Sequence, residues 1–377
     1  MEKAATDIYS FRKLRENGFT YVDKTAIILP LCDMSIGSQF FMARPRRFGK
    51  SLLVSTLHCL FEGRRELFHG LAIEPKWDWS KSWPVIHLDM GSCQAETVEA
   101  LKDKMRIMLL KEATRLGVEL RDEDPSNAFS LMIDDLAAKS KDGQIVLLVD
   151  EYDKPLLGHL SRPDVTQFRD ALKEFYSVIK TLDEKQSFTF LTGVSKFSKV
   201  SIFSDLNNLK DRTMTASEAT LLGYTHDELK RFFPESLKRI AAANGLSDDE
   251  AFAEVIKWYD GYRFEETAEK VINPVSFGLC AEAGRFRNYW STTAMTTFLT
   301  AIGFGVDAEV LTNEGRIDMT CETPAGIWLV DRPAEEALAQ IDAMNYAEKY
   351  DFSGKKVRKI GISFSSEKCT IGDWTAR

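Results

Sequence analysis

The sequence predicts an α/β protein built on a doubly wound parallel sheet, and three features indicate this class. A short loop ending in Gly49-Lys50-Ser51 lies between an apolar run and a helical pattern. A second apolar run, Ile145–Val149, ends at Asp150-Glu151. Strand-like and helix-like segments alternate between residues 38 and 192. Such alternation is typical of right-handed βαβ units with helices on both faces of the sheet.

The expected strands are short and apolar. They cover Ser38–Ala43, Pro84–Asp89, Ile145–Val149 and Phe188–Thr192. The third of these runs is apolar throughout, which is typical of a strand buried on both faces of a parallel sheet.

Amphipathic helices are expected between these strands. In Thr97–Leu116, apolar residues recur at three- and four-residue spacing, as on one face of a helix. They are Leu101, Met105, Met108 and Leu109. The other helices expected in this part of the chain are Leu52–Phe61, Asn127–Lys139 and Val165–Leu182.

The loop Arg44–Ser51 reads Arg-Pro-Arg-Arg-Phe-Gly-Lys-Ser and predicts a phosphate-binding loop. Backbone N–H groups at the start of the next helix point toward a bound anion, and the helix dipole favours its charge. In a P-loop the lysine reaches the β- and γ-phosphates, and the next hydroxyl binds Mg²⁺. The P-loop consensus begins with glycine, where this chain has Arg44. The predicted nucleotide contacts are Arg46, Arg47, Phe48, Gly49, Lys50, Ser51 and Leu52.

The acidic pair Asp150-Glu151 is expected at the carboxyl end of its strand. An aspartate there can hold the Mg²⁺ of a nucleotide, directly or through water. The glutamate is placed to orient and deprotonate an attacking water, so we assign Glu151 to catalysis together with Lys50. Acidic pairs at strand ends are also common on surfaces, but the combination with Gly49-Lys50-Ser51 favours a metal and nucleotide site.

A polar side chain that senses the γ-phosphate is expected on a neighbouring strand. Thr192, Ser195 and Lys196 are the candidates, and we favour Thr192 as the third catalytic residue because it ends its strand. The alternative is that this threonine only caps the following turn. Arg212 could act as an arginine finger, but the sequence does not distinguish it from a surface arginine.

With these motifs, the chain resembles the predicted AAA-ATPase-like family of bacterial proteins. Its members are P-loop ATPases that typically carry a PD-(D/E)XK nuclease-like domain at the C-terminus. The matching segments are Tyr21–Thr25, Arg44–Ser51, Asp150–Pro155, Thr192–Ser198, Trp258–Phe264, Asn273-Pro274 and Tyr289-Trp290. The resemblance covers roughly residues 5 to 300, and it implies that an arginine-rich loop is the usual form of this P-loop.

The resemblance also implies a helical lid after the nucleotide sheet. We expect the ATPase domain at residues 1–222, the lid at 223–300 and a small α+β nuclease-like remnant at 301–377. Thr225 with Glu228 is a predicted capping box, and Ser247 with Glu250 is a second predicted cap. The lid helices are expected at Asp227–Phe233, Ser236–Asn244 and Ser247–Tyr259. The aromatic residues that we expect to form the packing core of the lid are Trp258, Tyr259, Tyr262 and Phe264.

The family's nuclease site has a Gly-Arg-x-Asp strand followed by a strand ending in Glu-x-Lys. Its carboxylates bind Mg²⁺, and its lysine activates water or stabilises the phosphorane charge. Gly315–Asp318 matches the first element and places Asp318 at the metal-binding aspartate. The second strand reads Ile327–Pro333 without a Glu-x-Lys; Asp331 could replace the glutamate, but Arg332 cannot act as a base because it stays protonated. We therefore expect a remnant that does not cleave DNA.

The segments expected to follow these two strands also match the family. Helices are expected over Ala334–Ile341 and Asn345–Tyr350, and a later strand over Lys359–Phe364.

Composition is that of an ordinary globular protein. The net charge of −8 argues against a protein that coats nucleic acid, although the basic run Lys355–Lys359 could contact it locally or form a solvated strand edge. Six scattered cysteines without a CxxC pair favour reduced thiols in the cytoplasm. No apolar run reaches the ~18 residues of a membrane span, and the N-terminus has no secretory signal pattern.

The leading functional hypothesis is Mg²⁺-dependent ATP binding and hydrolysis that acts as a conformational switch. ATP is favoured over GTP because the sequence has no guanine-reading Asn-Lys-x-Asp loop. Two alternatives remain open: an ATP-regulated, metal-dependent nuclease acting on DNA, and a nucleotide-binding interaction module with little turnover. A DNA or protein partner and an oligomer are compatible with all three.

Overall fold

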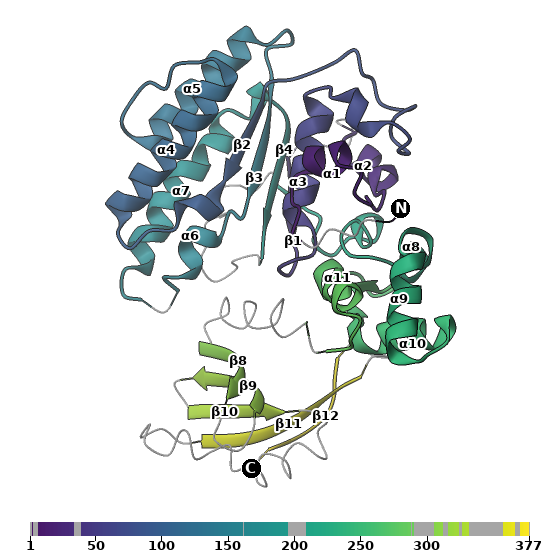
Figure 1. Ribbon diagram of the computed structural model, residues 1–377. Helices are drawn as coiled ribbons and strands as arrows, with labels where there is room; N and C mark the ends of the chain where they lie inside the picture. The colour runs from purple at the N-terminus through teal and green to yellow at the C-terminus, as the bar shows by residue number, and fades with distance from the viewer. Residues whose placement is uncertain are drawn as a thin grey trace. The chain divides into compact units, whose positions relative to one another are not determined.

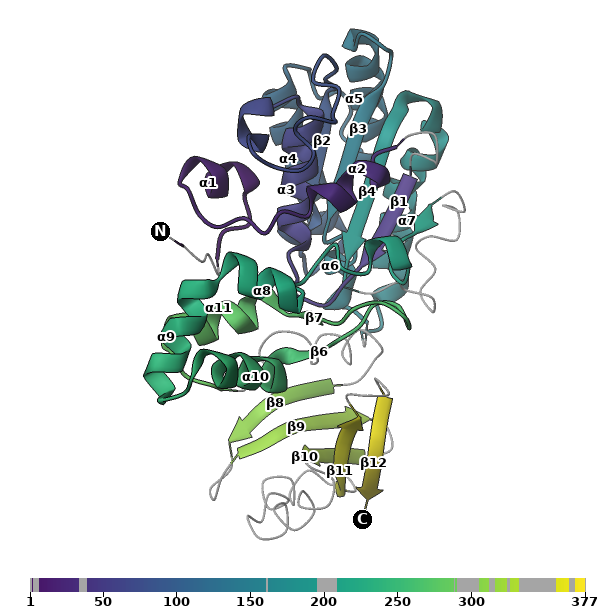
Figure 2. The ribbon, with the colours of Figure 1, turned by 90° about the vertical axis from the view of Figure 1, so that its right-hand side faces the viewer.

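The computed structural model describes residues 2, 7–33, 39–160, 162–194, 209–287 and 289, together with the backbone of five strands between residues 305 and 376. The chain forms two compact units (Figures 1 and 2). The first comprises residues 1–44, 48–236 and 264–269, and the second comprises residues 45–47, 237–263 and 270–377. Among the helices of the described residues, none has the length and apolar character needed to span a membrane.

The first unit is built around a five-stranded parallel sheet with the strand order β2-β3-β4-β1-β5. Its strands are β1 (Gln39–Ala43), β2 (Val85–Asp89), β3 (Ile145–Asp150), β4 (Gln186–Gly193) and β5 (Lys210–Asp211). Every residue of the three central strands is buried, because the sheet is covered on both faces. The parallel sheet predicted from the apolar runs is therefore confirmed.

Helices cover both faces of this sheet (Figure 1). On one face lie α4 (Val98–Leu116), α5 (Pro125–Lys139), α6 (Lys154–Leu157) and α7 (Val165–Thr181). On the other face lie α1 (Phe11–Glu16), α2 (Thr25–Leu31) and α3 (Lys50–Phe61). The four helices expected here are present with small shifts at their ends. The start of α5 was placed too late, because Asp124 caps the helix and Pro125 takes the first helical position.

The stripe of apolar residues predicted on α4 is buried, as its spacing indicates. The helix begins after Thr97, whose hydroxyl accepts from the N–H of Ala100. It ends at Gly117, which adopts φ 67°, a left-handed conformation that glycine takes without strain. Because α4 extends to Leu116, its residues Glu112 and Arg115 reach the backbone of β2.

The helix α8 (His226–Phe232) groups with the first unit, and the boundary between the units falls after Ser236. The predicted capping box of Thr225 and Glu228 is present. Glu228 also accepts from the buried Nζ of Lys24 at 2.5 Å, and the same Nζ donates to the carbonyl of Thr220 at 2.7 Å. This partly buried ion pair connects α8 to the N-terminal part of the sheet unit.

The second unit contains α10 (Asp248–Tyr259), the short strands β6 (Asp260–Tyr262) and β7 (Val271–Ile272), and α11 (Pro274–Ala283). The helix α9 (Pro234–Asn244) spans the boundary between the units. Ser247 and Glu250 form a complete capping box on α10.

The expected aromatic core of the lid is wrong in part. Tyr259 is buried in the second unit, and its hydroxyl donates to the carbonyl of Arg287 at 3.0 Å. Trp258 is exposed and stacks on Phe286. Phe264 is buried in the first unit, because its ring packs against the loop that follows β1.

The backbone of a second sheet is described near the C-terminus. Its order is β12-β11-β10-β9-β8, and only the β10–β11 pair is parallel. The strands are β8 (Gly305–Leu311), β9 (Arg316–Thr323), β10 (Gly326–Asp331), β11 (Val357–Ser365) and β12 (Thr370–Ala376). The helices expected at 334–341 and 345–350 lie outside the described residues, as do Lys355 and Lys356.

Candidate nucleotide site

The loop after β1 connects the carboxyl end of that strand to the start of α3. Gly49 caps α3 with φ 96°, a conformation that side chains disfavour. Arg47 has φ 64° in the same loop. A tight turn of this kind, followed at once by a helix, lets backbone N–H groups converge on an anion.

Lys50 is the first residue of α3, and only 7% of its surface is exposed. Its Nζ donates to the carbonyl oxygen of Arg44 at 2.9 Å. The ammonium is therefore folded back over its own loop.

Asp150 ends β3 and meets the loop across the sheet edge. Its carboxylate is hydrogen-bonded to the hydroxyl of Ser51, and the backbone N–H of Glu151 donates to its Oδ1 at 2.9 Å. Burial raises the pKa of Asp150 to about 6, against the opposing effects of the Ser51 hydrogen bond and the Lys50 charge. The structure thus brings together three of the predicted site residues from two distant segments of the chain.

These contacts coincide with a match to a known family. Residues 5–203 match the family model described as predicted AAA-ATPase. The chain belongs to this family. Residues 286–374 match the PD-(D/E)XK nuclease superfamily. A protein of Azotobacter chroococcum mcd 1, described as an uncharacterized protein in the vnfD 5′ region, is 39% identical over 300 residues, which are 79% of this chain and 55% of that protein. The chain therefore spans little more than half the length of this relative.

Glu151 of this family member follows Asp150 in a strained conformation. Its φ is 49°, which costs an ordinary residue on the order of 1–3 kcal/mol. The side chain is 31% exposed, and its Oε2 lies 3.6 Å from the Nζ of Lys154. A Cβ on Gly91 would lie 2.6 Å from the same Oε2, so the glycine leaves room for this carboxylate.

Thr192 lies on β4, between the strand of the loop and the strand of the acidic pair. It is buried, and its hydroxyl donates to the carbonyl of Met42 at 2.9 Å. The hydroxyl therefore joins β4 to β1, and it does not cap a turn. A γ-phosphate needs a donor, and this hydroxyl proton is already engaged. The other two sensor candidates, Ser195 and Lys196, lie outside the described residues.

Arg44 has a different role from a phosphate contact. Only 1% of its surface is exposed, and its guanidinium donates to the carbonyls of Ala43, Thr213 and Glu218. The guanidinium also lies 4.0 Å from the centre of the Phe264 ring. Burial lowers the pKa of Arg44 to about 10, so it is still charged at neutral pH. In place of the consensus glycine, this family member has a buried cation that anchors the start of the loop.

The side chains of the other predicted nucleotide-binding residues in the loop differ in their burial. Phe48 is buried, and its ring meets that of Phe264 edge-on at 5.4 Å, so only its backbone can face a nucleotide. Leu52 and Arg46 are half-buried and Arg47 is exposed. The backbone carbonyl of Arg46 accepts from Nδ2 of Asn273, within the second unit.

Arg212 does not lie as an arginine finger would. Its backbone N–H donates to the carbonyl of Phe41 at 2.7 Å, and its guanidinium lies 5.1 Å from the Phe40 ring centre. It is half-buried against β1, where it covers the sheet.

Asp89 is an acidic residue at this edge that our sequence reasoning missed. It ends β2 and pairs in register with Asp150 on β3. Its side chain is exposed, and Oδ1 accepts from the N–H of Gly91 at 2.9 Å. The signal was present in the sequence, because the carboxyl ends of parallel strands share one edge and both strands end in aspartate. In the described part of the chain, no group of three or more histidine, cysteine, aspartate or glutamate side chains has the arrangement of a metal site.

The backbone of the nuclease-like sheet places Asp318 and Asp331, the two predicted metal-binding residues, on neighbouring strands. The antiparallel register of β9 and β10 runs as far as Met319 and Val330. Asp318 and Asp331 come directly after this pair, one on each strand. Gly315 and Arg332, which flank these strands, lie outside the described residues.

Proposed function

We propose that this chain binds ATP with Mg²⁺ at the Gly49-Lys50-Ser51 loop and hydrolyses the γ-phosphate. The observation that carries this proposal is the hydrogen bond between the Ser51 hydroxyl and the buried Asp150 carboxylate. A hydroxyl after the loop lysine and an aspartate at a strand end are the two protein groups that hold Mg²⁺ in P-loop enzymes. Here they already contact each other.

The residues present fit both groups. Ser51 and Asp150 offer hard oxygen donors, and Mg²⁺ typically takes one or two such protein ligands and completes its shell with water and phosphate oxygens. Bound Mg²⁺ would neutralise charge on the β- and γ-phosphates. Lys50 would exchange the Arg44 carbonyl for phosphate oxygens, a charge-assisted contact that is stronger than the one it replaces.

Glu151 is the residue to which we assign the attacking water. It follows the aspartate that we assign to the metal, its carboxylate is partly exposed, and its backbone is strained while the carboxylate lies beside Gly91. Backbone strain of this kind clusters at functional sites. The carboxylate would accept a hydrogen bond from the water and take its proton as the phosphate is attacked.

We further propose that hydrolysis drives a conformational switch in a doubly wound P-loop domain with a helical lid. Asn273 supports this role, because it accepts from the N–H groups of Val275 and Ser276 at the start of α11 and donates to the carbonyl of Arg46. One side chain thus joins the tip of the loop to the start of a helix. A loop that closes on a phosphate would pull on that helix.

The test is phosphate release by the full chain, with and without DNA, together with equilibrium binding of ATP. Glu151→Gln keeps the shape of the side chain and removes the base, so ATP should still bind while phosphate release falls by about 100-fold. Glu119→Gln, an exposed glutamate away from the site, is the matched control. Equal turnover by wild type and Glu151→Gln would remove the assignment, and tight binding without any phosphate release would favour an interaction module.

The nuclease-like part has a second candidate function, favoured by the family match and the neighbouring Asp318 and Asp331. We propose that these two strands retain metal-binding carboxylates but do not cleave DNA. If Asp331 replaces the glutamate of Glu-x-Lys, Pro333 stands at the position of the lysine, and the neighbouring Arg332 stays protonated and cannot act as a base. A plasmid-nicking assay with Mg²⁺ or Mn²⁺ tests it. Cleavage by the wild type that is lost in Asp318→Ala would contradict the proposal and establish a nuclease.

A further inference from the structure

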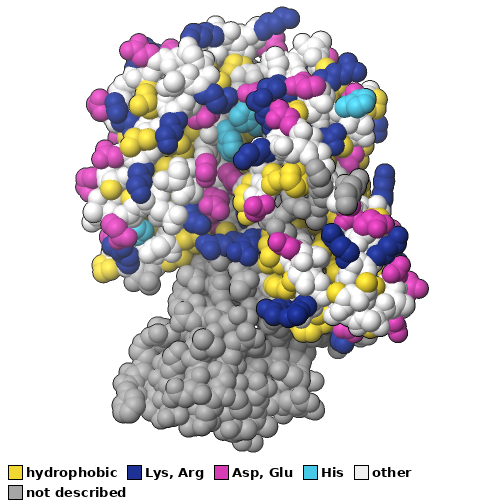
Figure 3. All heavy atoms as spheres, viewed as in Figure 1, with side chains coloured by type: hydrophobic (Ala, Val, Ile, Leu, Met, Phe, Trp, Pro, Cys, Tyr) yellow, Lys and Arg dark blue, Asp and Glu magenta, His cyan; other side chains and the backbone are white. Residues whose placement is uncertain are grey.

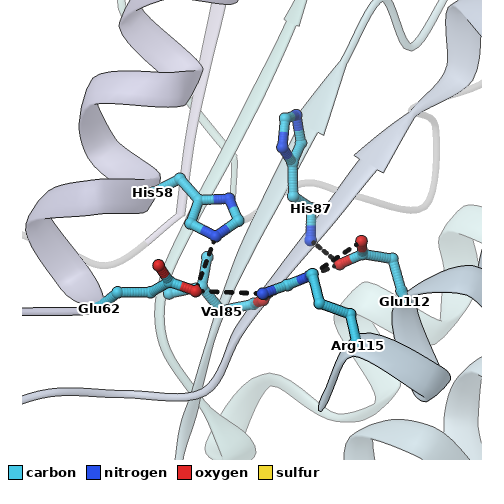
Figure 4. A network of polar contacts seen from close by, with 6 residues as sticks. All are labelled: His58, Glu62, Val85, His87, Glu112 and Arg115. Carbon is cyan, nitrogen blue, oxygen red and sulfur yellow. Dashed lines mark hydrogen bonds and ion pairs between the residues drawn. The ribbon is translucent and has the colours of Figure 1, made fainter. Parts of the chain in front are cut away.

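The strand β2 lies at one end of the parallel sheet, and side chains of α4 cover part of its open edge. Arg115 Nη2 donates to the carbonyl of Val85 at 2.5 Å, and Glu112 accepts from the backbone N–H of His87 at 3.0 Å. Figure 4 shows both contacts. These two side chains take the place of a neighbouring strand, which protects the edge from pairing with another chain.

The same network fixes the charges around this edge. Arg115 binds Glu112 on its own helix and Glu62 on α3, at 2.8 Å and 3.1 Å. His58 lies 2.9 Å from Glu62 and completes the network (Figure 4). Glu112 is therefore paired with Arg115 and held in place, although Arg115 is shared with Glu62.

Next to this network, residues of β2, the short helix η3 (Met90–Cys93) and α4 line an open cavity of about 280 Å³. That volume is close to the lower end of the range for small-molecule sites. Its polar lining consists of His87, Asp89, Ser92, Lys104, Lys111 and Glu112. The space-filling view shows histidine side chains in the hollow between α3 and α4, with basic and acidic side chains around them (Figure 3).

His87 supplies a polar atom that the protein itself does not use. Its Nε2 is buried and has no hydrogen-bond partner among the described residues. The ring points away from Glu112, which binds the backbone N–H of the same residue (Figure 4). Burial lowers the pKa of His87 to about 4, so the ring is neutral at physiological pH and can donate or accept one hydrogen bond.

Two lysines of α4 give the cavity a positive side. Lys111 is exposed, and no ion pair or hydrogen bond of its side chain is found in the described structure. Lys104 donates one hydrogen bond, to the carbonyl of Gln94, and an ammonium has three donors. Within the lining these two cations face the carboxylates of Asp89 and Glu112, and Glu112 is engaged by Arg115 and by the N–H of His87.

We propose that the cavity between β2 and α4 binds a small anionic metabolite, whose phosphate or carboxylate group is held by Lys104 and Lys111 and whose polar body faces His87 and Ser92. The cavity does not include the nucleotide loop, because β3 and β4 lie between β2 and the strand that carries the loop. Asp89 is the one lining residue that also belongs to the acidic edge of the candidate nucleotide site.

The test follows the side-chain NMR signals of the histidines, of which the chain has five, in the full-length Lys50→Ala protein. This background is expected to weaken phosphate binding at the nucleotide loop. Inorganic phosphate and succinate are added separately at millimolar concentration. The His87 signal should move with at least one of them, and that of His58 should follow, because the two rings are 5.5 Å apart. The signal of His69, which is exposed elsewhere, should not move.

The two probes distinguish the source of the anionic group. A response to phosphate alone indicates a phosphorylated ligand, and a response to succinate alone indicates a carboxylic acid. If neither probe moves the His87 signal, the proposal is wrong.

Variants then test the role of the lysines. Lys111→Ala and Lys104→Ala should each weaken binding of the active probe by about tenfold, the effect of one lost charge-assisted contact. Lys141→Ala changes an exposed lysine in the turn before β3 and should leave binding unchanged. Equal effects of the three substitutions would mean that only overall charge matters, and would overturn the site.

Discussion

The two halves of the candidate nucleotide site are held in opposite ways. The loop half begins at Arg44, whose guanidinium binds three backbone carbonyls in the core. The acidic half, at the ends of β2 and β3, combines a buried Asp150 of raised pKa with a Glu151 of positive φ. The hydrogen bonds of Arg44 thus stabilise the loop half. In the acidic half, the burial of Asp150 and the backbone conformation of Glu151 are both unfavourable. Unfavourable conformations and buried charges of this kind are common at sites that bind a charged ligand or metal ion.

The largest effect is expected at the anchor of the loop half. Arg44→Gly restores the P-loop consensus residue but leaves three buried carbonyls without their donor and empties a large volume. We expect the free energy of unfolding to fall by about 3 kcal/mol or more, measured by urea denaturation.

Arg47→Gly is the matched control in the same loop. Arg47 is exposed and has φ 64°, so glycine there should be neutral or slightly stabilising. Similar losses for the two variants would show that Arg44 is not a special anchor.

Lys50 should behave in the opposite way. Its Nζ donates to the carbonyl of Arg44, a contact that phosphate oxygens would replace, so Lys50→Ala should lower stability less than Arg44→Gly and weaken ATP binding by about 100-fold or more. Equilibrium binding of a fluorescent ATP analogue measures this, with Lys141→Ala as the control. If Lys50→Ala retains its ATP affinity, the loop does not bind the nucleotide.

The sequence was sufficient to place Lys50, Ser51 and Asp150 in one candidate site. It was sufficient because a loop before a helix and an aspartate after a buried strand are local patterns. The direction of Arg44 could not be predicted, because its acceptors Thr213 and Glu218 are far along the chain.

Two other errors also arose from contacts between residues that are far apart in the chain, and a third was an oversight. Phe264 was assigned to the lid because it follows the lid helices, and only the fold shows that its ring packs on Phe48. The hydrogen bond of Thr192 depends on strand pairing that the sequence does not specify. Asp89 could have been predicted from the sequence, since its strand ends in an aspartate, as the strand of Asp150 does.

The close packing of the acidic half can be tested at Gly91. A Cβ there would lie 2.6 Å from Glu151 Oε2 and 2.9 Å from Asp89 Oδ1, so Gly91→Ala must displace one carboxylate. We expect ATP turnover to fall by about tenfold with ATP affinity retained, because misplacing a catalytic group affects the reacting water more than binding. Gly158→Ala, where no atom lies within 4 Å, is the control. An unchanged turnover would place Glu151 outside the reaction.

The smallest effect, and of opposite sign, is expected at Asp150. Because burial raises its pKa to about 6 in the folded protein, above the ordinary ~3.9, its ionised form opposes folding. This unfavourable contribution is absent below pH ~4 and complete above pH ~6. Asp150→Asn keeps the shape and removes the charge, so the nucleotide-free protein should melt about 2 °C higher at neutral pH, with the difference shrinking toward pH 5.

Adding Mg²⁺ and ATP should reverse that order. A bound cation stabilises the ionised carboxylate, so the wild type should gain melting temperature with Mg²⁺–ATP and Asp150→Asn should gain much less. Thermal melting with ATP alone and with Mg²⁺–ATP separates the contribution of the metal from that of the nucleotide. If Asp150→Asn lowers the melting temperature of the nucleotide-free protein, the carboxylate stabilises the fold, and the acidic half would then resemble the loop half.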